Sequence, residues 1–374
     1  MEYVNLGDVA TYINGYAFKP EQRGKKGLPI IRIQDLNGNS HDLGFFDGEY
    51  PEQVEINTGD ILISWSGSLG VYKWNKGKAL LNQHIFKVLF NKIEIDKEYF
   101  CYAIRNSLSS MSQQTHGATM KHITKKDFDN ISIPYPDLNE QKKIANNLNI
   151  VNKLIMFYEK ELILFEQMVK ARFIEMFGNM ILNPHKWEKF LLAELCDVRD
   201  GTHDSPKYHS KGYPLITSKN ITGGKIKFSG CNLISKEDFD KINHRSKVDY
   251  GDILMPMIGT IGNPVIVDIK DEFAIKNVAL VKLKKDSLVN NIFIKSLLES
   301  DYFYKTVIDK VRGGTQKFIS LGDIRKLEIC LPPIELQNQF ADFVQQVDKS
   351  REEVKKSLEK TQQLYDSLMQ EYFG

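Results

Sequence analysis

The chain is 374 residues long, which allows two or three domains, and its 42% apolar and 26% charged residues are typical of a soluble globular protein. No run of about 18 apolar residues is present, so the sequence excludes a membrane-spanning helix. The formal net charge of +2 permits nucleic-acid binding without indicating it, although residues 179–333 hold 24 basic and 19 acidic side chains.

The first 137 residues predict a domain of mixed strands and helices. Short apolar runs bounded by turn residues predict strands at Leu28–Ile33, Ile61–Ser64 and Phe86–Phe90. A helix is expected over residues 97–110, and a glycine-containing loop over 115–122 follows it. The acidic start of the chain enters this domain directly, so we expect no signal peptide and a cytoplasmic protein.

A long amphipathic helix is predicted from residue 138. After the extended segment that ends at Pro136, apolar residues recur in steps of four and three from Ile144 to Met176, as in a coiled coil. Asn139 is the expected N-cap. The residues predicted to pair with a second helix are Leu148, Val151, Ile155, Tyr158, Leu162 and Phe165.

Residues 179–333 repeat the pattern of the first domain. They predict strands at Tyr213–Thr217, Ile253–Met255 and Val278–Leu283, a helix over 291–305 and a second glycine-containing loop over 312–317. The Gly-Asp-Ile-Leu motif of 59–62 returns at 251–254, Gln141 returns as Gln337, and Gly15 returns as Gly201. A repeat of this length indicates two similar domains that differ by short insertions.

A second helix with the same period is predicted from residue 334 onward. Its expected pairing residues are Val344, Val347, Val354, Leu358, Tyr365 and Leu368. Because the first helix enters the second domain and the second helix leaves it, two packed helices would run antiparallel, each about 60 Å long. The alternative is two independent amphipathic helices, each lying on its own domain. Arg172, Arg351 and Thr361 interrupt the apolar seam, which suits a fixed register or the entry of another subunit's helices.

The order and duplication of these motifs resemble the specificity (S) subunit of type I restriction–modification systems, over essentially the whole chain. The shared frame includes an opening segment, Val4–Val9, the Gly-Asp-Ile-Leu strand and a Gly-x-x-Gly turn at 67–70 and 259–262. It ends with Ile133–Gln141, which reads Ile-Pro-Tyr-Pro-Asp-Leu-Asn-Glu-Gln. The second copy departs from that last motif at Cys330 and Leu336, so the start of its helix is expected to differ.

The resemblance implies two α/β (mixed α+β) target-recognition domains, 1–137 and 179–333, joined by a long antiparallel two-helix coiled coil, 138–178 and 334–374, with pseudo-twofold symmetry. In that family each target-recognition domain reads one half of a bipartite site in double-stranded DNA. The helices set the spacer and dock two modification (methyltransferase) subunits, which restriction subunits can join. S-adenosylmethionine, ATP and Mg are therefore expected in partner subunits, and no cofactor is expected in this chain.

DNA recognition needs hydrogen-bonding side chains for base edges, and cations, hydroxyls and glycine-rich turns for phosphates. Side chains of these types at predicted strand ends and turns of the first domain are Ser64, Ser66, Ser68, Lys73, Gln83, His84, His116, Thr119, Lys121 and His122. Those of the second domain are Arg199, His203, Lys219, Asn220, Arg245, Thr260, Lys276, Asn277, Arg312, Thr315, Gln316 and Lys317. Solvated loop residues without a function would give the same pattern. Trp65 and Trp74 are expected in the core or as wedges.

Other classes of protein fit the sequence less well. Asp252 with Asp268 and Lys270 loosely resembles the metal site of a restriction nuclease, but the first copy has no such carboxylate pair over residues 71–76. Asp60 and Asp252 therefore suit a structural role in the turn before a strand. Neither an adenine-methylase motif nor a phosphate-binding loop is present, and the four cysteines lack metal-site spacing. A coiled-coil scaffold without DNA contact remains the alternative.

Overall fold

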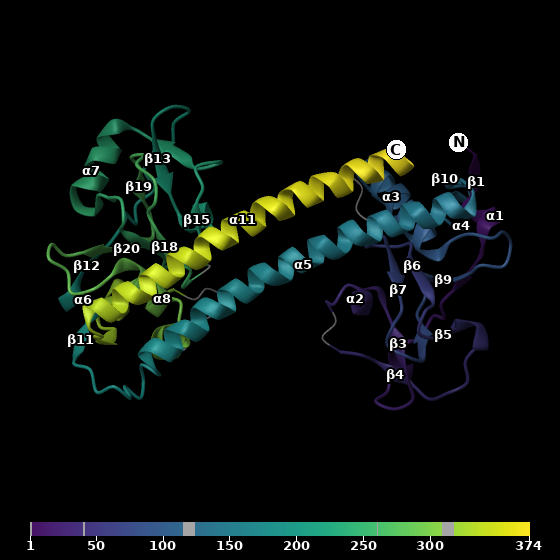
Figure 1. The fold of residues 1–374 in the computed structure, drawn as a ribbon, viewed down its shortest axis with the longest axis horizontal. Helices are drawn as coiled ribbons and strands as arrows, with labels where there is room; N and C mark the ends of the chain where they lie inside the picture. The colour runs from purple at the N-terminus through teal and green to yellow at the C-terminus, as the bar shows by residue number, and fades with distance from the viewer. Residues whose placement is uncertain (1, 40–41, 115–123, 260, 309–317) are drawn as a thin grey trace. The chain divides into compact units, whose positions relative to one another are not determined.

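The computed structural model describes residues 2–39, 42–114, 124–259, 261–308 and 318–374 (Figure 1). The chain divides into two compact units, Met1–Tyr158 with Ser357–Gly374 (unit 1) and Glu159–Lys356 (unit 2). Two 40-residue helices, α5 (Leu138–Phe177) and α11 (Ile334–Phe373), each contribute residues to both units. Within the described residues, no helix is both long and apolar enough to cross a membrane.

Unit 1 contains two four-stranded sheets. The first is antiparallel and has the order β2 (Thr11–Asn14), β9 (Ile85–Leu89), β6 (Ile61–Ser64) and β7 (Gly70–Lys73). The second has the order β4 (Phe45–Phe46), β3 (Leu28–Ile31), β8 (Ala79–Leu81) and β5 (Glu55–Ile56), with β3 and β8 parallel. The other elements are β1 (Tyr3–Asn5), paired with β10 (Ser132–Pro134), and the helices α1 (Leu6–Val9), α2 (Ile33–Leu36), α3 (Lys97–Gln114) and α4 (Lys125–Asp129).

Unit 2 repeats this plan. Its antiparallel sheet has the order β12 (Cys196–Asp200), β20 (Val278–Leu283), β17 (Ile253–Pro256) and β18 (Val265–Ile266). A second sheet has the order β16 (Asn232–Ile234), β13 (Tyr213–Ile216) and β19 (Ala274–Ile275), with β13 and β19 parallel. The other elements are β11 (Lys189–Leu191), paired with β21 (Glu328–Cys330), the hairpin β14 (Ile221–Thr222) and β15 (Lys225–Ile226), and the helices α6 (Leu192–Leu195), α7 (Lys236–Ser246), α8 (Asn291–Leu298), α9 (Asp301–Phe303) and α10 (Leu321–Arg325).

The repeated Gly-Asp-Ile-Leu motif forms the strand that lies between two cores in each unit. In unit 1, Ile61 and Ile63 pack in the cluster that includes α3, whereas Leu62 packs in a second cluster with Trp74. In unit 2, Ile253 belongs to the larger core and Leu254 to the opposite one. A strand buried on both faces needs a continuous apolar run, and the motif supplies it.

The duplication extends to single backbone positions. Gly15 follows β2 and Gly201 follows β12. A Cβ atom on either would lie 2.1 Å from a carbonyl oxygen, that of Asn82 for Gly15 and that of Ile275 for Gly201. Because only glycine allows this approach, the repeated glycines hold matching strand ends together. The prediction of duplicated, mixed α/β domains is confirmed.

The long helices pack against each other within each unit. In unit 1, Nδ2 of Asn147, near the start of α5, donates to the hydroxyl of Tyr372 at the end of α11 (3.3 Å). In unit 2, the ring of Phe173 near the end of α5 lies 5.5 Å from that of Phe340 near the start of α11. Start meets end in one unit and end meets start in the other, so the prediction of paired antiparallel helices is confirmed. The alternative of independent helices is wrong.

The predicted pairing residues all have at least partly buried side chains. Fully or nearly buried are Leu148, Val151, Ile155, Val344 and Val347, and partly buried are Tyr158, Leu162, Phe165, Val354, Leu358, Tyr365 and Leu368. The prediction of Asn139 as N-cap is wrong. Helix α5 begins at Leu138, two residues earlier than a cap at Asn139 requires, and Oδ1 of Asp137 accepts from the backbone amides of Asn139 (2.9 Å) and Glu140 (3.0 Å). Aspartate provides the better cap because its charge also favours the helix N-terminus.

Candidate nucleic-acid interface

Two turns meet at the same end of the four-stranded antiparallel sheet in each unit. In unit 1, the amide of Trp65, just after β6, donates to the carbonyl of His84 before β9 (3.2 Å). In unit 2, the amide of Met257 donates to the carbonyl of Asn277 before β20 (3.4 Å). His84 and Asn277 both have a left-handed backbone, with φ of 73° and 54°. The two units therefore place a different polar side chain on the same backbone frame.

In unit 1 this end of the sheet carries aromatic and amide side chains. The indole Nε1 of Trp65 donates to Oδ1 of Asn14, the last residue of β2 (3.2 Å), and its ring stacks on Phe86 with centroids 5.7 Å apart. The ring of His84 lies edge-on to Trp65, 5.0 Å away. Gln83 is exposed beside them. The partly buried Trp65 and the buried Trp74 both pack in cores, as the sequence suggests.

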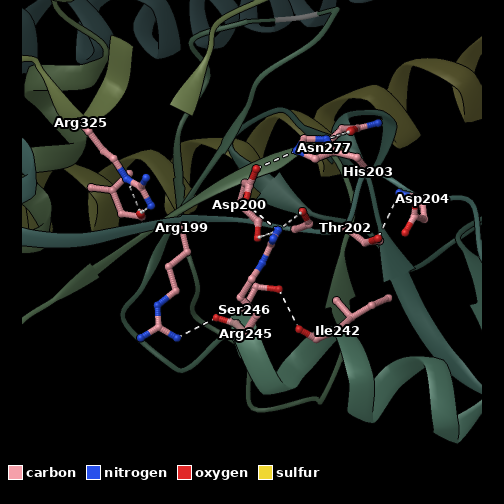
Figure 2. Close-up of polar contacts among 12 residues, drawn as sticks. Arg199, Asp200, Thr202, His203, Asp204, Ile242, Arg245, Ser246, Asn277 and Arg325 are labelled. Atoms are coloured by element: carbon pink, nitrogen blue, oxygen red, sulfur yellow. Dashed lines mark hydrogen bonds and ion pairs between the residues drawn. The ribbon is translucent and has the colours of Figure 1, made fainter. Parts of the chain in front are cut away.

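In unit 2 the matching end carries a network of charged groups, shown in Figure 2. Asp200, the last residue of β12, accepts from Nη2 of Arg245 at 2.7 Å and lies 2.8 Å from Nε2 of His203. The other ring nitrogen of His203, Nδ1, lies 2.8 Å from Oδ1 of Asn277. Arg245 comes from α7 and also donates to the carbonyl of Gly201 (3.1 Å). Three segments distant in sequence, which carry Asp200 with His203, Arg245 and Asn277, thus form one network.

Further cations surround this network. Arg199 donates to the carbonyl of Arg245 through Nη1 (2.7 Å) and to the carboxylate of Asp197 through Nε (2.8 Å). The hydrogen bond from Arg199 holds the pKa of Asp197 below its ordinary value. Lys276 donates to the hydroxyl of Ser205. The carboxylates fix the cations in place while leaving much of their surface exposed.

The surroundings of His203 favour its charged form. Its pKa is raised, first by the hydrogen bond with Asn277 and then by that with Asp200, whereas burial and the charge of Arg245 act in the opposite direction. The His203 side chain is 62% exposed, but that of Asp200 is only 14% exposed. A shielded carboxylate therefore holds an accessible imidazole ring.

The structure brings ten of the thirteen described candidate residues to the matching sheet ends, five in each unit. Arg199, His203, Arg245, Lys276 and Asn277 lie at one end of unit 2, and Ser64, Ser66, Ser68, Gln83 and His84 at the matching end of unit 1. Lys73 lies at the opposite end of β7, paired with Glu98, and Lys219 is exposed in a separate turn. The candidates that lie outside the described residues are His116, Thr119, Lys121, His122, Thr260, Arg312, Thr315, Gln316 and Lys317.

Two candidates form turns instead of presenting a polar surface. Ser64 is fully buried, and its hydroxyl donates to the carbonyl of Ser68. Asn220 is 7% exposed, and its Oδ1 accepts from the amide of Thr217 (3.1 Å). Asp200 and Asn14 are not among the predicted site residues, because the prediction considered side chains that could contact DNA and not the side chains that orient them. Both residues directly precede a repeated glycine, and their matching position in the two copies could have identified them.

The repeated aspartates brace turns in both units. Oδ2 of Asp60 accepts from the amide of Asn57 (2.8 Å) and pairs with Lys87, and Oδ2 of Asp252 accepts from the amide of Asp249 (2.7 Å) and pairs with Lys282. Burial raises the pKa of Asp252, an effect that the Lys282 ammonium opposes. No cluster of His, Cys, Asp and Glu in the described part of the chain could hold a metal ion. Asp60 and Asp252 therefore have the structural role in the turn before a strand that the sequence predicts.

Comparison with known structures shows the same fold. The crystal structure of the S subunit of a type I restriction–modification system from M. genitalium matches with a TM-score of 0.60 and 15% identity, over 100% of this chain and 96% of that one. A chain from a structural study of complex assembly and conformational transition of the type I R-M system matches with a TM-score of 0.59 and 16% identity, over 99% and 97%. At these identities the likeness concerns the fold alone.

Sequence relatives agree with that fold. The EcoBI specificity subunit of Escherichia coli is 26% identical over 406 residues, covering 99% of this chain and 85% of the relative. The MjaVIII specificity subunit of Methanocaldococcus jannaschii is 26% identical over 391 residues, covering 97% and 91%. The model of the type I restriction modification DNA specificity domain matches residues 1–164 and 184–363. The chain therefore belongs to the type I restriction–modification specificity family.

Proposed function

We propose that this chain is the non-catalytic, DNA-reading subunit of a type I restriction–modification complex. Each unit would read one half of a bipartite site in double-stranded DNA, through the target-recognition domains at 1–137 and 179–333. The observation that carries the proposal is the matched sheet end, where one backbone frame presents Trp65, His84 and Asn14 in unit 1 but His203, Asn277 and Asp200 in unit 2. A shared frame with different polar groups suits the recognition of two different base sequences.

The chemistry of the two ends fits groove contacts. Asn277 can pair with an adenine edge or donate to guanine, and Arg199 and Arg245 can meet phosphates or guanine. The carboxylates of Asp197 and Asp200 would keep the two arginines in one orientation, which favours specificity over raw affinity. Methyl transfer is assigned to a partner subunit because the chain belongs to the specificity family.

The outward face of α5 fits a partner subunit. Ile150, Leu154, Phe157, Leu164 and Met168 are exposed and recur in steps of four, three, seven and four. This stripe begins about 200° around the helix from the seam that packs on α11. All residues of α11 are described, and there only Leu364 is a large exposed apolar residue. An exposed heptad stripe on a helix favours docking of amphipathic helices, and we assign it to two methyltransferase subunits.

Cofactors follow from this division of labour. S-adenosylmethionine belongs to the methyltransferase subunits, and ATP and Mg belong to restriction subunits where these join the complex. The proposal places the whole assembly in the cytoplasm, where it has access to DNA.

Methylation-sensitive sequencing tests the proposal. DNA from cells that express this chain with its methyltransferase should carry a split methylated motif with a fixed gap. Replacing residues 179–333 by the corresponding segment of a relative should change one half of the motif and leave the other intact. A change in both halves, or in neither, contradicts the assignment of one half-site to each unit. A scaffold without DNA contact predicts that Arg245→Ala leaves the motif and DNA retention unchanged.

Docking has a separate test. Phe157→Lys and Leu164→Lys should each abolish copurification of the methyltransferase, because a charge in the centre of an apolar helix interface cannot be solvated. Leu364→Lys, an equally exposed position on α11, is the matched control and should leave copurification intact. If copurification is lost only in Leu364→Lys, docking belongs to α11 and not to α5.

A further inference from the structure

Both ring nitrogens of His203 face an oxygen atom (Figure 2). Nε2 faces the carboxylate of Asp200 and Nδ1 faces the amide oxygen of Asn277, both at 2.8 Å. An oxygen accepts a hydrogen bond, so both contacts are satisfied together only when both ring nitrogens carry protons. The geometry therefore corresponds to the imidazolium form of His203.

Loss of one proton has a defined consequence. The Asp200 carboxylate accepts only, so the neutral ring keeps its proton on Nε2 and exposes a lone pair on Nδ1 to Asn277. The amide of Asn277 must then rotate by about 180° so that Nδ2 donates to Nδ1. In the charged state the amino group of Asn277 points away from His203, and in the neutral state the carbonyl oxygen does.

We propose that His203 is a protonation switch that sets whether Asn277 presents an amino group or a carbonyl oxygen to the DNA half-site of unit 2. This inference rests on the proposed function. An outward amino group donates to purine N7, guanine O6 or thymine O4, whereas an outward oxygen accepts from adenine N6 or cytosine N4. The preferred base at the contacted position would therefore change with the charge of one histidine.

The surroundings restrict the switch to this pair. Arg245 from α7 binds Oδ1 of Asp200 at 2.7 Å, so the other carboxylate oxygen, Oδ2, is the one that faces His203. Asp204 follows in the same loop and Lys276 lies in the turn beside Asn277, where it donates to Ser205. Backbone hydrogen bonds with Thr202 (3.1 Å) and Met257 (3.4 Å) hold the main chain of Asn277, so a turn of the amide about its last torsion is enough to exchange its oxygen and nitrogen. Within the described residues, no group accepts a hydrogen bond from Nδ2 of Asn277.

Unit 1 lacks the same device at the same place. Asn14 precedes Gly15 as Asp200 precedes Gly201, but Oδ1 of Asn14 accepts from the indole of Trp65 and carries no charge. A protonated ring would have no carboxylate to hold it at that position. The inference therefore predicts an amide reversal driven by His203 in the unit 2 half-site and not in the unit 1 half-site.

The experiment uses the assembled complex of the full chain with its methyltransferase. The probe is a pool of duplexes that carry the methylated motif mapped from genomic DNA, with each half-site randomised in turn. Methylated products are sequenced after reaction at about pH 6 and about pH 8, on either side of an ordinary histidine pKa. The preference at one base position of the unit 2 half-site should change by about tenfold, which is the scale of a base-edge contact. His203→Gln should leave the preferences in the unit 1 half-site as they are in the wild type at each pH.

Three variants separate the switch from a merely structural role. His203→Gln should remove the pH response of the unit 2 half-site. Asp200→Asn, which withdraws the charge that holds the imidazolium, should give at pH 6 the preference that the wild type has at pH 8. His209→Gln changes an exposed histidine of the same unit outside the network, and it should respond as the wild type does.

The outcomes distinguish the two proposals. If the wild-type complex selects no split motif at either pH, the proposed function fails. If it selects a split motif whose second half is unaffected by pH, only the switch is overturned. A pH response that persists in His203→Gln overturns it equally, because another group would then be titrating. Reading of the unit 1 half-site by each variant serves as the control for folding and assembly.

Discussion

At the scale of single residues, two buried glutamines have the same task in the two units. Gln337 donates to the carbonyl of Pro332 (2.8 Å), and its Oε1 accepts from the amide of Asn290 (2.9 Å). Gln141 likewise donates to Pro136 (2.8 Å) and accepts from the amide of Asp96 (2.9 Å). Each glutamine joins the first turn of a long helix to the segment before the helix of its own unit, α3 or α8.

Gln337→Leu should lower the free energy of unfolding of unit 2 by about 3 kcal/mol. The substitution leaves the amide of Asn290 and two backbone carbonyls buried without partners, and each such group costs about 1–3 kcal/mol. Gln141→Leu should act similarly on unit 1. Amide hydrogen exchange, which resolves the two units, measures both effects. Gln345→Leu, at an exposed position of α11, should stay within about 0.5 kcal/mol of the wild type. An equally small effect of Gln337→Leu would contradict the assigned role.

His203 should also make unit 2 more stable in mild acid than at neutral pH. Its pKa is raised in the folded state by Asn277 and Asp200, so the folded chain binds the proton more tightly than the unfolded chain does. The resulting stabilisation is complete below the ordinary histidine pKa of about 6.5, which applies to the unfolded chain. It is lost as the pH rises through the raised pKa of the folded state. Urea midpoints of the wild type and His203→Gln should therefore diverge in acid and converge above that range. If the difference between the two urea midpoints does not change with pH, the contacts of His203 do not stabilise its charged form.

At the scale of elements, the two short helices α4 and α10 begin with matched hydroxyl caps. Oγ1 of Thr124 accepts from the amide of Asp127 (3.2 Å), and Oγ of Ser320 accepts from that of Asp323 (3.1 Å). Arg325 at the end of α10 donates to the carbonyl of Val198 in β12 (2.7 Å). The cap therefore sets where α10 meets the sheet that carries the candidate interface.

Ser320→Ala should cost about 1 kcal/mol of unfolding free energy, and Thr124→Ala about the same in unit 1. Ser320→Gly should cost only a few tenths, because glycine suits the cap backbone and leaves the amides accessible to water. Chemical denaturation of the three variants gives the comparison. If Ser320→Ala proves as stable as the wild type, the hydroxyl contributes nothing as a cap.

Strand positions follow from sequence where burial on both faces dictates composition. The apolar run Ile61–Ser64 predicts β6 with its observed bounds, and Val278–Leu283 predicts β20. The sequence gives no sign of α7, because only Phe239 and Ser246 are buried in that helix and its other residues are polar or only partly buried. The single helix expected over 291–305 is interrupted, since Ser300 begins a new helix after α8. Local pattern predicts elements with a strong period and misses those whose packing is mostly polar.

The sequence predicts the types of residue in the candidate site, but it does not predict which of them contact one another. Arg199, His203, Arg245 and Asn277 stand out as hydrogen-bonding side chains near strand ends. Nothing local shows that Asp200 joins them, since Arg245 is 45 residues away in sequence and Asn277 lies 74 residues from His203. These contacts depend on the pairing of β12 with β20 and on the position of α7. Tertiary structure decides them, and the sequence pattern does not.

At the scale of the whole molecule, the proposed function requires a fixed gap between two half-sites of the DNA. Each unit has its own core, and each helix belongs to both units. The duplication provides two DNA-binding units, one for each half-site. We expect the common length of α5 and α11 to set that gap.

Removing one heptad from both helices, residues 153–159 and 357–363, should shorten the gap in the methylated motif by about three base pairs. Seven residues of helix span about 10 Å, and B-form DNA rises about 3.4 Å per base pair. A heptad also preserves the apolar seam and turns the helix by only about 20°, so the contacts Asn147–Tyr372 and Phe173–Phe340 can both persist. The same shift of seven brings Leu164 to the place that Phe157 leaves, so an apolar side chain still stands there on the docking stripe. Removing 153–159 from α5 alone should destroy methylation, because one of these contacts must then be lost. Sequencing of methylated DNA from cells with each variant provides the measurement. An active double deletion with an unchanged gap would mean that the helices hold the units together without measuring the distance between half-sites.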